Sequence, residues 1–268
     1  MIDSHTHSSF SHDSFERAES MIERAIELNL SYFALTNHLD NDCRYNYIGF
    51  GEVPQLDFKG WAAERLRLKE KYKGKINLAC GLEIGFDIPS QNDDKKVIDG
   101  YEFDVIINSV HNVSSTDIYY PQFFDGKEKK EIYSKYLLTI YESLRAYDYD
   151  IIGHIGYIMR KAPYKNKKLE YSDHSDVLDE ILKSIISKNK TIELNTHSEG
   201  TGLNFFPTSE ILKRYKELGG TNVSFGSDAH SKFDIGRNYK FAAEGAKEYG
   251  FDYWTCYTER RENKIKID

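Results

Sequence analysis

Short apolar runs alternate along the chain with longer stretches in which apolar residues recur every three or four positions. The short runs predict strands, and the longer stretches predict helices that bury one face. Strands that alternate with helices are typical of parallel βα units. The chain has seven predicted strands, at residue 2 and at 32–35, 76–82, 105–110, 151–153, 191–195 and 223–225.

The helical stretches have start and stop signals of their own. Ser14 is the predicted N-cap of the first helix, and Gly219 with Gly220 ends the helix that precedes them. The predicted helices occupy 16–28, 58–72, 127–145, 177–188, 209–218 and 242–249. Residues 45–58 and 114–126 are predicted loops, and 254–267 is predicted to be a final hairpin or an irregular tail.

Histidines and carboxylates follow at least six of the predicted strands. Because the carboxyl ends of parallel barrel strands meet on one face, residues far apart in sequence are expected to converge there. His5 and His7 also share one side of an extended chain, since alternate side chains point the same way. The candidate metal ligands are His5, His7, His12, His38, Glu83, His111, His154, Asp228 and His230.

The alternative without a metal site is that the N-terminal histidines form a solvated surface segment. Residues 3–7 alone do not exclude it. The chain has only nine histidines, however, and seven of them stand at predicted strand ends. Chance explains that placement poorly. His174 does not fit the pattern and is predicted at the surface.

Nine nitrogen and oxygen ligands are too many for one ion. The set predicts two or three ions that share a bridging carboxylate, for which Glu83 is the best placed. Imidazole and carboxylate without thiolate favour Zn, Mn or Fe and fit Ca or Mg poorly. A water molecule bound to such an ion has a pKa lowered toward 7.

Composition restricts the class of protein. With 268 residues, 40% of them hydrophobic, and no linker-like tract, residues 1–268 are predicted to form one domain. A net charge of −7 argues against nucleic acid or an acidic membrane surface as partner. Three unpatterned cysteines and the absence of a long apolar run predict a cytoplasmic protein without disulfides or membrane segments. The charge still allows a small anionic substrate, because metal ions invert the local field.

Six short motifs stand at the ends of the predicted strands. They are Asp3-Ser4-His5-Thr6-His7, Thr36-Asn37-His38, Gly81-Leu82-Glu83, Ser109-Val110-His111, Gly153-His154-Ile155-Gly156 and Gly226-Ser227-Asp228-Ala229-His230. Taken together and in order, they resemble the motifs of the polymerase-and-histidinol-phosphatase (PHP) superfamily. The likeness spans residues 1 to about 240, and the segments 153–160 and 193–196 resemble the monofunctional histidinol-phosphate phosphatases.

The resemblance implies a distorted (β/α)₇ TIM-like barrel with three divalent transition-metal ions at its C-terminal mouth. It assigns the first ion to His5, His7, Glu83 and Asp228. It assigns the second ion to Glu83, His111 and His154, and the third ion to His12, His38 and His230.

The same resemblance implies hydrolysis of L-histidinol phosphate to L-histidinol and phosphate by a metal-bridging hydroxide. The leaving alkoxide needs a proton, which Asp228, His197 or a metal-bound water could supply. Arg160 is by position a surface residue of the basic stretch 160–168, but the resemblance and its planar fork of donors favour phosphate binding. Tyr157, Asn195 and Arg237 are the further substrate-binding candidates.

Two departures from the family pattern bear on the site. Asn37 stands where the family usually has Asp, and His197-Ser198-Glu199 replaces a common Ser-Gly. The change at residue 37 bears on the orientation of a metal ligand. The change at residues 197–199 bears on substrate specificity. The alternatives that stay open are a PHP phosphatase for nucleotides, sugar phosphates or phosphotyrosine, a catalytically weak PHP binding module, and a metal-dependent amide hydrolase. The last usually carries a carboxylated lysine, and no lysine follows a predicted strand.

Overall fold

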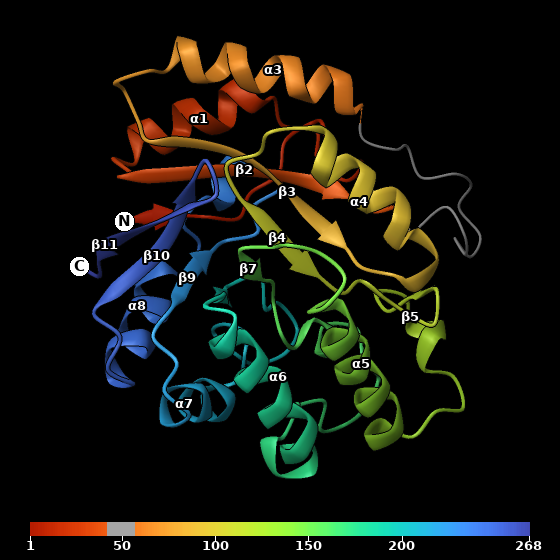
Figure 1. Cartoon of the computed structure of the whole chain (residues 1–268). Coiled ribbons are helices and arrows are strands. Elements are labelled where there is room, and N and C mark those ends of the chain that lie inside the picture. Colours follow the sequence, from red (N-terminus) through yellow and green to blue (C-terminus); the bar gives the residue numbers. More distant parts are fainter. Residues whose placement is uncertain (42–56) are drawn as a thin grey trace.

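The computed structural model describes residues 1–41 and 57–268 as helices around a twisted, mostly parallel sheet (Figure 1). The strand order is β1-β2-β3-β4-β7-β8-β9-β10-β11, and only the last pair, β10 and β11, is antiparallel. The strands are β1 Ile2–Asp3, β2 Tyr32–Leu39, β3 Leu78–Gly85, β4 Ile106–Ser109, β7 Ile151–Ile152, β8 Thr191–Asn195, β9 Val223–Gly226, β10 Tyr253–Thr258 and β11 Arg261–Lys266.

All seven strands predicted from the apolar runs are confirmed as parallel strands. Every residue of β2 and β3 is buried, as expected for parallel strands covered on both faces. Both strands extend past their apolar runs, so that His38 pairs with Glu83 inside the ladder. The prediction ended these strands too early, because polar residues that serve the site read as the start of a loop.

The helices lie outside the sheet, with α1 and α3 along one side of β2 and α5 to α8 on the opposite side of the molecule (Figure 1). They are α1 Ala18–Glu27, α3 Phe58–Lys71, α4 Gln91–Gly100, α5 Lys129–Ser143, α6 Ser175–Ser187, α7 Ser209–Glu217 and α8 Tyr239–Glu248. Single-turn 3₁₀ helices are η1 Ile88–Ser90, η2 Pro121–Phe124, η3 Tyr157–Met159, η4 Tyr171–Asp173 and η5 Lys232–Asp234.

The six predicted helices are confirmed within a few residues, with corrections at several points. Arg17, not Ser14, occupies the N-cap of α1, and Ser14 instead donates its hydroxyl to the carbonyl oxygen of His230 at 2.8 Å. Helix α4 was missed, because its sequence is almost entirely polar.

The segments predicted as loops or tail differ in part from the structure. The predicted loop 114–126 contains the turn and second strand of a small hairpin, β5 Asn112–Val113 with β6 Thr116–Asp117, and the short helix η2. Residues 254–267 form the hairpin β10–β11 rather than an irregular tail. The predicted loop 45–58 falls almost wholly outside the described residues.

The segment that follows β1 joins the end of β9. The amide of Ser4 donates to the carbonyl oxygen of Phe225 at 2.9 Å, and the amide of His7 donates to that of Ala229 at 2.8 Å. In the reverse direction, the amide of Asp228 donates to the carbonyl oxygen of His5 at 2.9 Å. These bonds bring the first histidine motif beside the last one.

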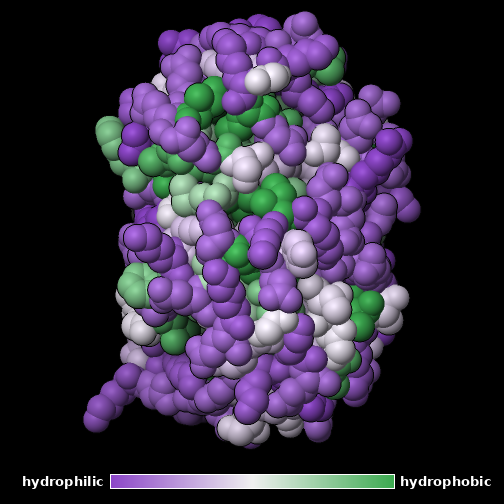
Figure 2. Space-filling model, turned by 90° about the vertical axis from the view of Figure 1, so that its left-hand side faces the viewer, coloured by the Kyte–Doolittle hydropathy of each residue, from purple (hydrophilic) through white to green (hydrophobic). Residues whose placement is uncertain are grey.

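The opposite end of the sheet, where the strands begin, carries both chain termini and the β10–β11 hairpin (Figure 1). Figure 2 turns this side of the molecule toward the viewer, and hydrophilic residues cover most of it. Apolar side chains show mainly in patches between them. None of the helices within residues 1–41 and 57–268 has both the length and the apolar character that crossing a membrane requires.

Candidate metal centre and active site

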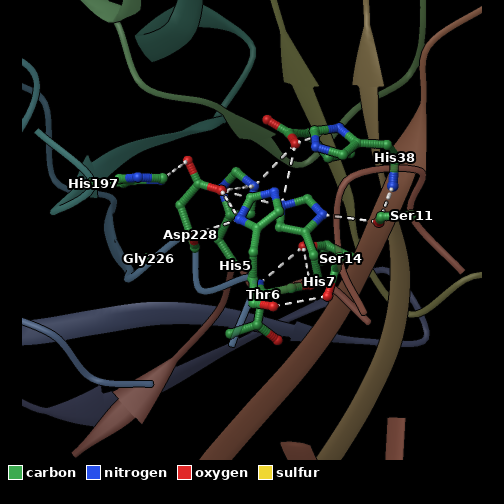
Figure 3. A network of polar contacts seen from close by, with 12 residues as sticks. His5, Thr6, His7, Ser11, Ser14, His38, His197, Gly226 and Asp228 are labelled. Atoms are coloured by element: carbon green, nitrogen blue, oxygen red, sulfur yellow. Dashed lines mark hydrogen bonds and ion pairs between the residues drawn. The ribbon is translucent and has the colours of Figure 1, made fainter. Parts of the chain in front are cut away.

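The structure brings all nine predicted ligands together at the carboxyl end of the parallel sheet. They come from β2 and β3 and from the segments that follow β1, β4, β7 and β9, and Figure 3 shows several of them pointing toward a common centre. Most are buried, and His12 and His230 keep about a quarter of their side-chain surface exposed, 25% and 22%.

Glu83 lies at the middle of the cluster. Its Oε2 is 3.2 Å from Nε2 of His5, 3.5 Å from Nε2 of His7 and 3.0 Å from Nδ1 of His38. Its Oε1 is 2.7 Å from Nε2 of His154 and 3.3 Å from Nε2 of His111. One carboxylate thus faces five imidazoles, with a different group on each oxygen, which is the arrangement that a bridging ligand needs.

Asp228 completes a group with the first two histidines. Its Oδ1 is 3.2 Å from Nε2 of His7 and 3.8 Å from Nε2 of His5. Asp228 has a left-handed backbone, with φ at 53°, two residues after the end of β9. Ligand atoms of His5, His7 and Asp228 all lie within 4.8 Å of one another, a spacing that one ion can span.

The remaining predicted ligands gather at the outer edge of the cluster. The rings of His12 and His230 lie 5.4 and 5.7 Å from that of His38, centroid to centroid. The carboxylate of Asp13 stands between two of them, with Oδ2 3.0 Å from Nε2 of His230 and 3.5 Å from Nε2 of His38. Asp13 is therefore a further oxygen ligand available at this edge.

The cluster fits metal ions on the evidence of its own atoms. Several buried nitrogen and oxygen atoms that face one another have no hydrogen-bond partner, which is costly unless a cation satisfies them. Two more close groups, His7 with His38 and His230 and His38 with Glu83 and His111, meet the same 4.8 Å spacing. The unpartnered atoms of this kind include Nε2 of His5, His7 and His230, Nδ1 of His38 and of His197, and Oε2 of Glu83.

The pKa values show how strongly the cluster attracts positive charge. Burial by itself raises the pKa of Glu83, but the surrounding imidazoles, His5 first, reverse this and hold that pKa well below its usual range. Burial likewise lowers the pKa of His5, and the carboxylates of Glu83, Glu193 and Asp228 outweigh it and raise that pKa well above the ordinary value. His7 differs: burial and the neighbouring imidazoles lower its pKa to about 3.

Sequence reasoning missed the residues that hold the ligand rings. Glu193 accepts from Nδ1 of His5 at 2.6 Å with Oε1, and from the amide of His154 at 2.7 Å with Oε2. Asp40 lies 3.0 Å from Nδ1 of His111 and 3.1 Å from Nδ1 of His38. Strand alternation could have found both, since Glu193 shares a face with Asn195 and Asp40 follows His38 by two positions.

Asn37 acts on the cluster through serines rather than directly. Its Oδ1 accepts from the amide and hydroxyl of Ser8, at 2.8 and 3.0 Å, and from the hydroxyl of Ser11 at 3.2 Å. Ser11 Oγ lies 3.1 Å from Nδ1 of His7, and His7 is the donor there, because the hydroxyl proton is already given to Asn37. Nε2 of His7 is thereby left with its lone pair toward the cluster.

A cavity of about 470 Å³ opens above the cluster, and Tyr157, Arg160 and His197 form part of its wall. The ring of Tyr157 lies 5.0 Å from that of His154. Nη2 of Arg160 lies 2.7 Å from Nε2 of His197, and Nδ1 of His197 lies 3.4 Å from Oδ2 of Asp228. Three of the predicted substrate or proton-transfer residues thus stand next to the ligands.

Two other substrate candidates do not line this cavity. Arg237 is turned to Glu199 and Asp234, at 2.6 and 2.7 Å, because these carboxylates satisfy its guanidinium outside the site. Asn195 is buried, and its Oδ1 accepts from the amide of His197 at 2.9 Å. Its position supports the loop after β8 rather than a ligand in the cavity.

His174 corrects another prediction. It is 6% exposed rather than at the surface, occupies the N-cap of α6, and has Nδ1 3.2 Å from Oγ of Ser134. The polar sequence around His174 did not indicate that α5 would pack over this side chain. His174 remains apart from the metal cluster.

Comparison with known proteins gives a consistent result. The model of the PHP domain family matches residues 3–197. A protein of Clostridium acetobutylicum named "Probable histidinol-phosphatase" is 35% identical over 252 residues, 92% of this chain and 93% of that one. The histidinol-phosphatase of Lactococcus lactis subsp. lactis is 31% identical over 233 residues, 85% and 84% of the two chains.

A solved structure is similar over almost the whole length. The crystal structure of histidinol phosphate phosphatase from Lactococcus lactis, complexed with zinc, L-histidinol and phosphate, has a TM-score of 0.83 and 28% identity, and covers 98% of both chains. The fold, the matched family model and the named relatives agree. The chain therefore belongs to the PHP domain family, and similar relatives carry the name histidinol-phosphatase.

Proposed function

We propose that the protein is a metal-dependent phosphomonoesterase that hydrolyses L-histidinol phosphate to L-histidinol and phosphate. The observation that carries the proposal is the cavity over nine converging imidazole and carboxylate ligands, with Arg160 on its wall. The named relatives and the neighbour crystallised with zinc, L-histidinol and phosphate support the same substrate.

In this proposal, residues 1–268 form a single PHP-type domain, a distorted (β/α)₇ barrel built from β1, β2, β3, β4, β7, β8 and β9. The hydrogen bonds between residues 4–7 and the end of β9 support closure between the first and last of these strands. The β10–β11 hairpin extends the sheet where the strands begin.

Three divalent ions, Zn, Mn or Fe, fit the ligand set. His5, His7, Glu83 and Asp228 would hold the first ion, Glu83, His111 and His154 the second, and His12, His38 and His230 the third. The distances around Glu83 support its sharing between two ions. When bound, the ions supply a water of lowered pKa and positive charge for the phosphoryl oxygens.

The chain's own residues bind the phosphate and move the proton. Arg160 offers its planar guanidinium to a phosphate dianion, and the ring of Tyr157, 5.3 Å from Cζ of Arg160, supports it from one side. Asp228 is ionised, because neighbouring imidazoles hold its pKa well below the usual range against the effect of burial. The low pKa makes Asp228 a weak base for the proton of the attacking water, but a strong acid toward the leaving oxygen once it carries that proton.

A panel of phosphomonoesters tests the substrate. We expect kcat/KM for L-histidinol phosphate to exceed that for nucleotides, sugar phosphates and phosphotyrosine by a large factor. A flat profile, or a preference for another ester, would reduce the assignment to a PHP phosphatase of other specificity. Metal-loaded protein that hydrolyses none of the panel would point to a binding module.

A further inference from the structure

His197 stands between a cation and a metal-site carboxylate. On one side, Nη2 of Arg160 donates to its Nε2 at 2.7 Å. On the other side, its Nδ1 lies 3.4 Å from Oδ2 of Asp228, and Figure 3 shows the ring edge directed at that carboxylate from the side opposite His38. Asp228 meanwhile uses Oδ1 toward His5 and His7, so its two oxygens face different partners.

The contact with Arg160 determines the tautomer of His197. A guanidinium has only donors, so Nε2 must accept and carries no proton. A neutral imidazole then has its proton on Nδ1, where it faces Asp228. That nitrogen has no lone pair left for a metal ion, although His197, Asp228 and His230 lie close enough to suggest a ligand group. The nitrogen facing Arg160 likewise has no proton to give.

His197 and Arg160 are each held in place by neighbouring residues. The amide of His197 donates to Oδ1 of Asn195 at 2.9 Å, and the hydroxyl of Thr196 donates to the carbonyl oxygen of Arg237 at 2.7 Å. The guanidinium of Arg160 lies against two rings, with Cζ 5.3 Å from the centroid of Tyr157 and 5.9 Å from that of Tyr119. The imidazole therefore meets a guanidinium whose plane is already restricted.

We propose that His197 is a positioning residue: it orients Arg160 over the metal cluster and connects it to Asp228, and it is neither a metal ligand nor the proton donor. The inference deepens the proposed phosphatase function and rests on it. A guanidinium has five N–H donors, so the single bond to His197 leaves four for a phosphate dianion. His197 thus fixes the orientation of the Arg160 guanidinium and leaves most of its N–H donors free for phosphate.

Three variants separate the roles of the ring. His197→Ala removes both contacts, and His197→Asn has no acceptor at the position of Nε2. His197→Gln places an amide oxygen near that position, so that Arg160 keeps its acceptor. Glu199→Gln is the matched control, because it changes a charge in the same loop that pairs with Arg237 and not with Arg160.

We expect His197→Ala and His197→Asn to weaken binding of inorganic phosphate, measured by calorimetry, and to lower kcat/KM by about 10- to 10²-fold, as misplaced binding groups do. His197→Gln should recover most of both losses. Metal content should stay at the wild-type value in all three. Loss of an ion from His197→Ala would overturn the proposal in favour of a ligand role.

The leaving group distinguishes positioning from proton donation. Cleavage of p-nitrophenyl phosphate expels a stabilised phenoxide and needs little protonation, whereas an alkyl phosphate expels an alkoxide that needs a proton. A positioning residue predicts equal fold-losses for His197→Ala on both substrates. A loss confined largely to L-histidinol phosphate would identify a proton donor and contradict the proposal.

A double-mutant cycle tests the connection to Arg160. If His197 acts through Arg160, then Arg160→Ala combined with His197→Ala should be no worse than Arg160→Ala alone. Additive losses would overturn the proposal. Wild-type protein that cleaves p-nitrophenyl phosphate but not L-histidinol phosphate would instead refute the proposed substrate, and the cycle would then be decided on p-nitrophenyl phosphate and phosphate binding.

Discussion

The two ends of the parallel sheet both bury carboxylates, but they neutralise them differently. Where the strands begin, Asp104 forms an ion pair with Lys69, whose Nζ lies 2.7 Å from the carboxylate. Asp150 forms one with Arg260, whose Nε lies 2.5 Å from the carboxylate. Backbone amides complete both sites, with Cys80 N at 2.8 Å from Asp104 and Ile106 N at 2.8 Å from Asp150.

Where the strands end, Glu83 and Asp228 have only imidazoles as ion-pair partners among residues 1–41 and 57–268. Lysine and arginine supply permanent positive charge to a buried carboxylate. Histidine can give up its proton and present a lone pair instead.

The two ends of the sheet therefore have different roles: one stabilises the fold and the other carries the candidate chemistry. The first end contains its own counter-charges and is complete as protein. The second end leaves its carboxylates and imidazoles dependent on positive charge that comes from outside the chain, as metal sites do.

The largest expected effect comes from Glu83. Glu83→Ala should lose more than one metal ion and lower kcat/KM by about 10³-fold or more, on the order of 4 kcal/mol of transition-state stabilisation. His38→Ala should lose mainly one ion. Elemental analysis of the purified variants checks both. Equal single-ion losses would show that Glu83 does not bridge. Asp104→Asn, at the other end of the sheet, is the control and should keep the full metal content.

Arg160 should rank next. Arg160→Ala is expected to lower kcat/KM by about 10²-fold, roughly 3 kcal/mol, because the phosphate loses its two-pronged partner. Metal content should not change, since arginine ligates no ion. Arg160→Lys should recover only part of the loss. Arg145→Ala, at an exposed position just after the end of α5, is the matched control. Steady-state kinetics that do not separate it from Arg160→Ala would show that Arg160 is an ordinary surface residue.

Arg260 tests the structural end. Arg260→Ala leaves Asp150 buried without its cation and should lower the free energy of unfolding by about 1–3 kcal/mol, with kcat and metal content unchanged. Urea unfolding measures the change. Arg261→Ala is the control, because its guanidinium is exposed and lies 3.9 Å from an exposed Glu259. A loss of metal from Arg260→Ala would show that the two ends are not independent.

The smallest effect concerns pH. Burial raises the pKa of Asp150, and Arg260 opposes that rise. A carboxyl whose folded-state pKa is raised costs stability once it ionises, so stability falls as pH rises from its unfolded pKa through its folded pKa. Without Arg260 the pKa of Asp150 rises further. The cost of Arg260→Ala should therefore shrink on acidification below neutral pH, and a cost that grows in acid would contradict the assignment.

The sequence predicted the parallel strands and the convergence of the candidate ligands for one physical reason. An apolar run that ends in His or Asp reports both a buried strand and what its carboxyl end presents, as at Ile151-Ile152-Gly153-His154. The strand order then converges those ends on one face. Predicting that the candidate ligands lie together needed no knowledge of the connecting loops.

Strand alternation points to Glu193 and Asp40, but it does not show which imidazole ring each of them holds. Glu193 lies inside a strand and Asp40 at the end of one, so only the three-dimensional register shows which ring each of them holds. Arg237 was the weaker arginine candidate by sequence, and its local pairing with Asp234 and Glu199 turns it away from the cavity. Side-chain direction in loops depends on such pairings, which a linear pattern does not contain.

The central claim is that the carboxyl end of the sheet is a multi-metal phosphatase centre. Elemental analysis and L-histidinol phosphate hydrolysis on one purified sample test it most directly, before and after chelation. We expect two to three transition-metal ions per chain, loss of activity when they are removed and recovery when they return. Full activity in protein that contains essentially no metal would contradict the account.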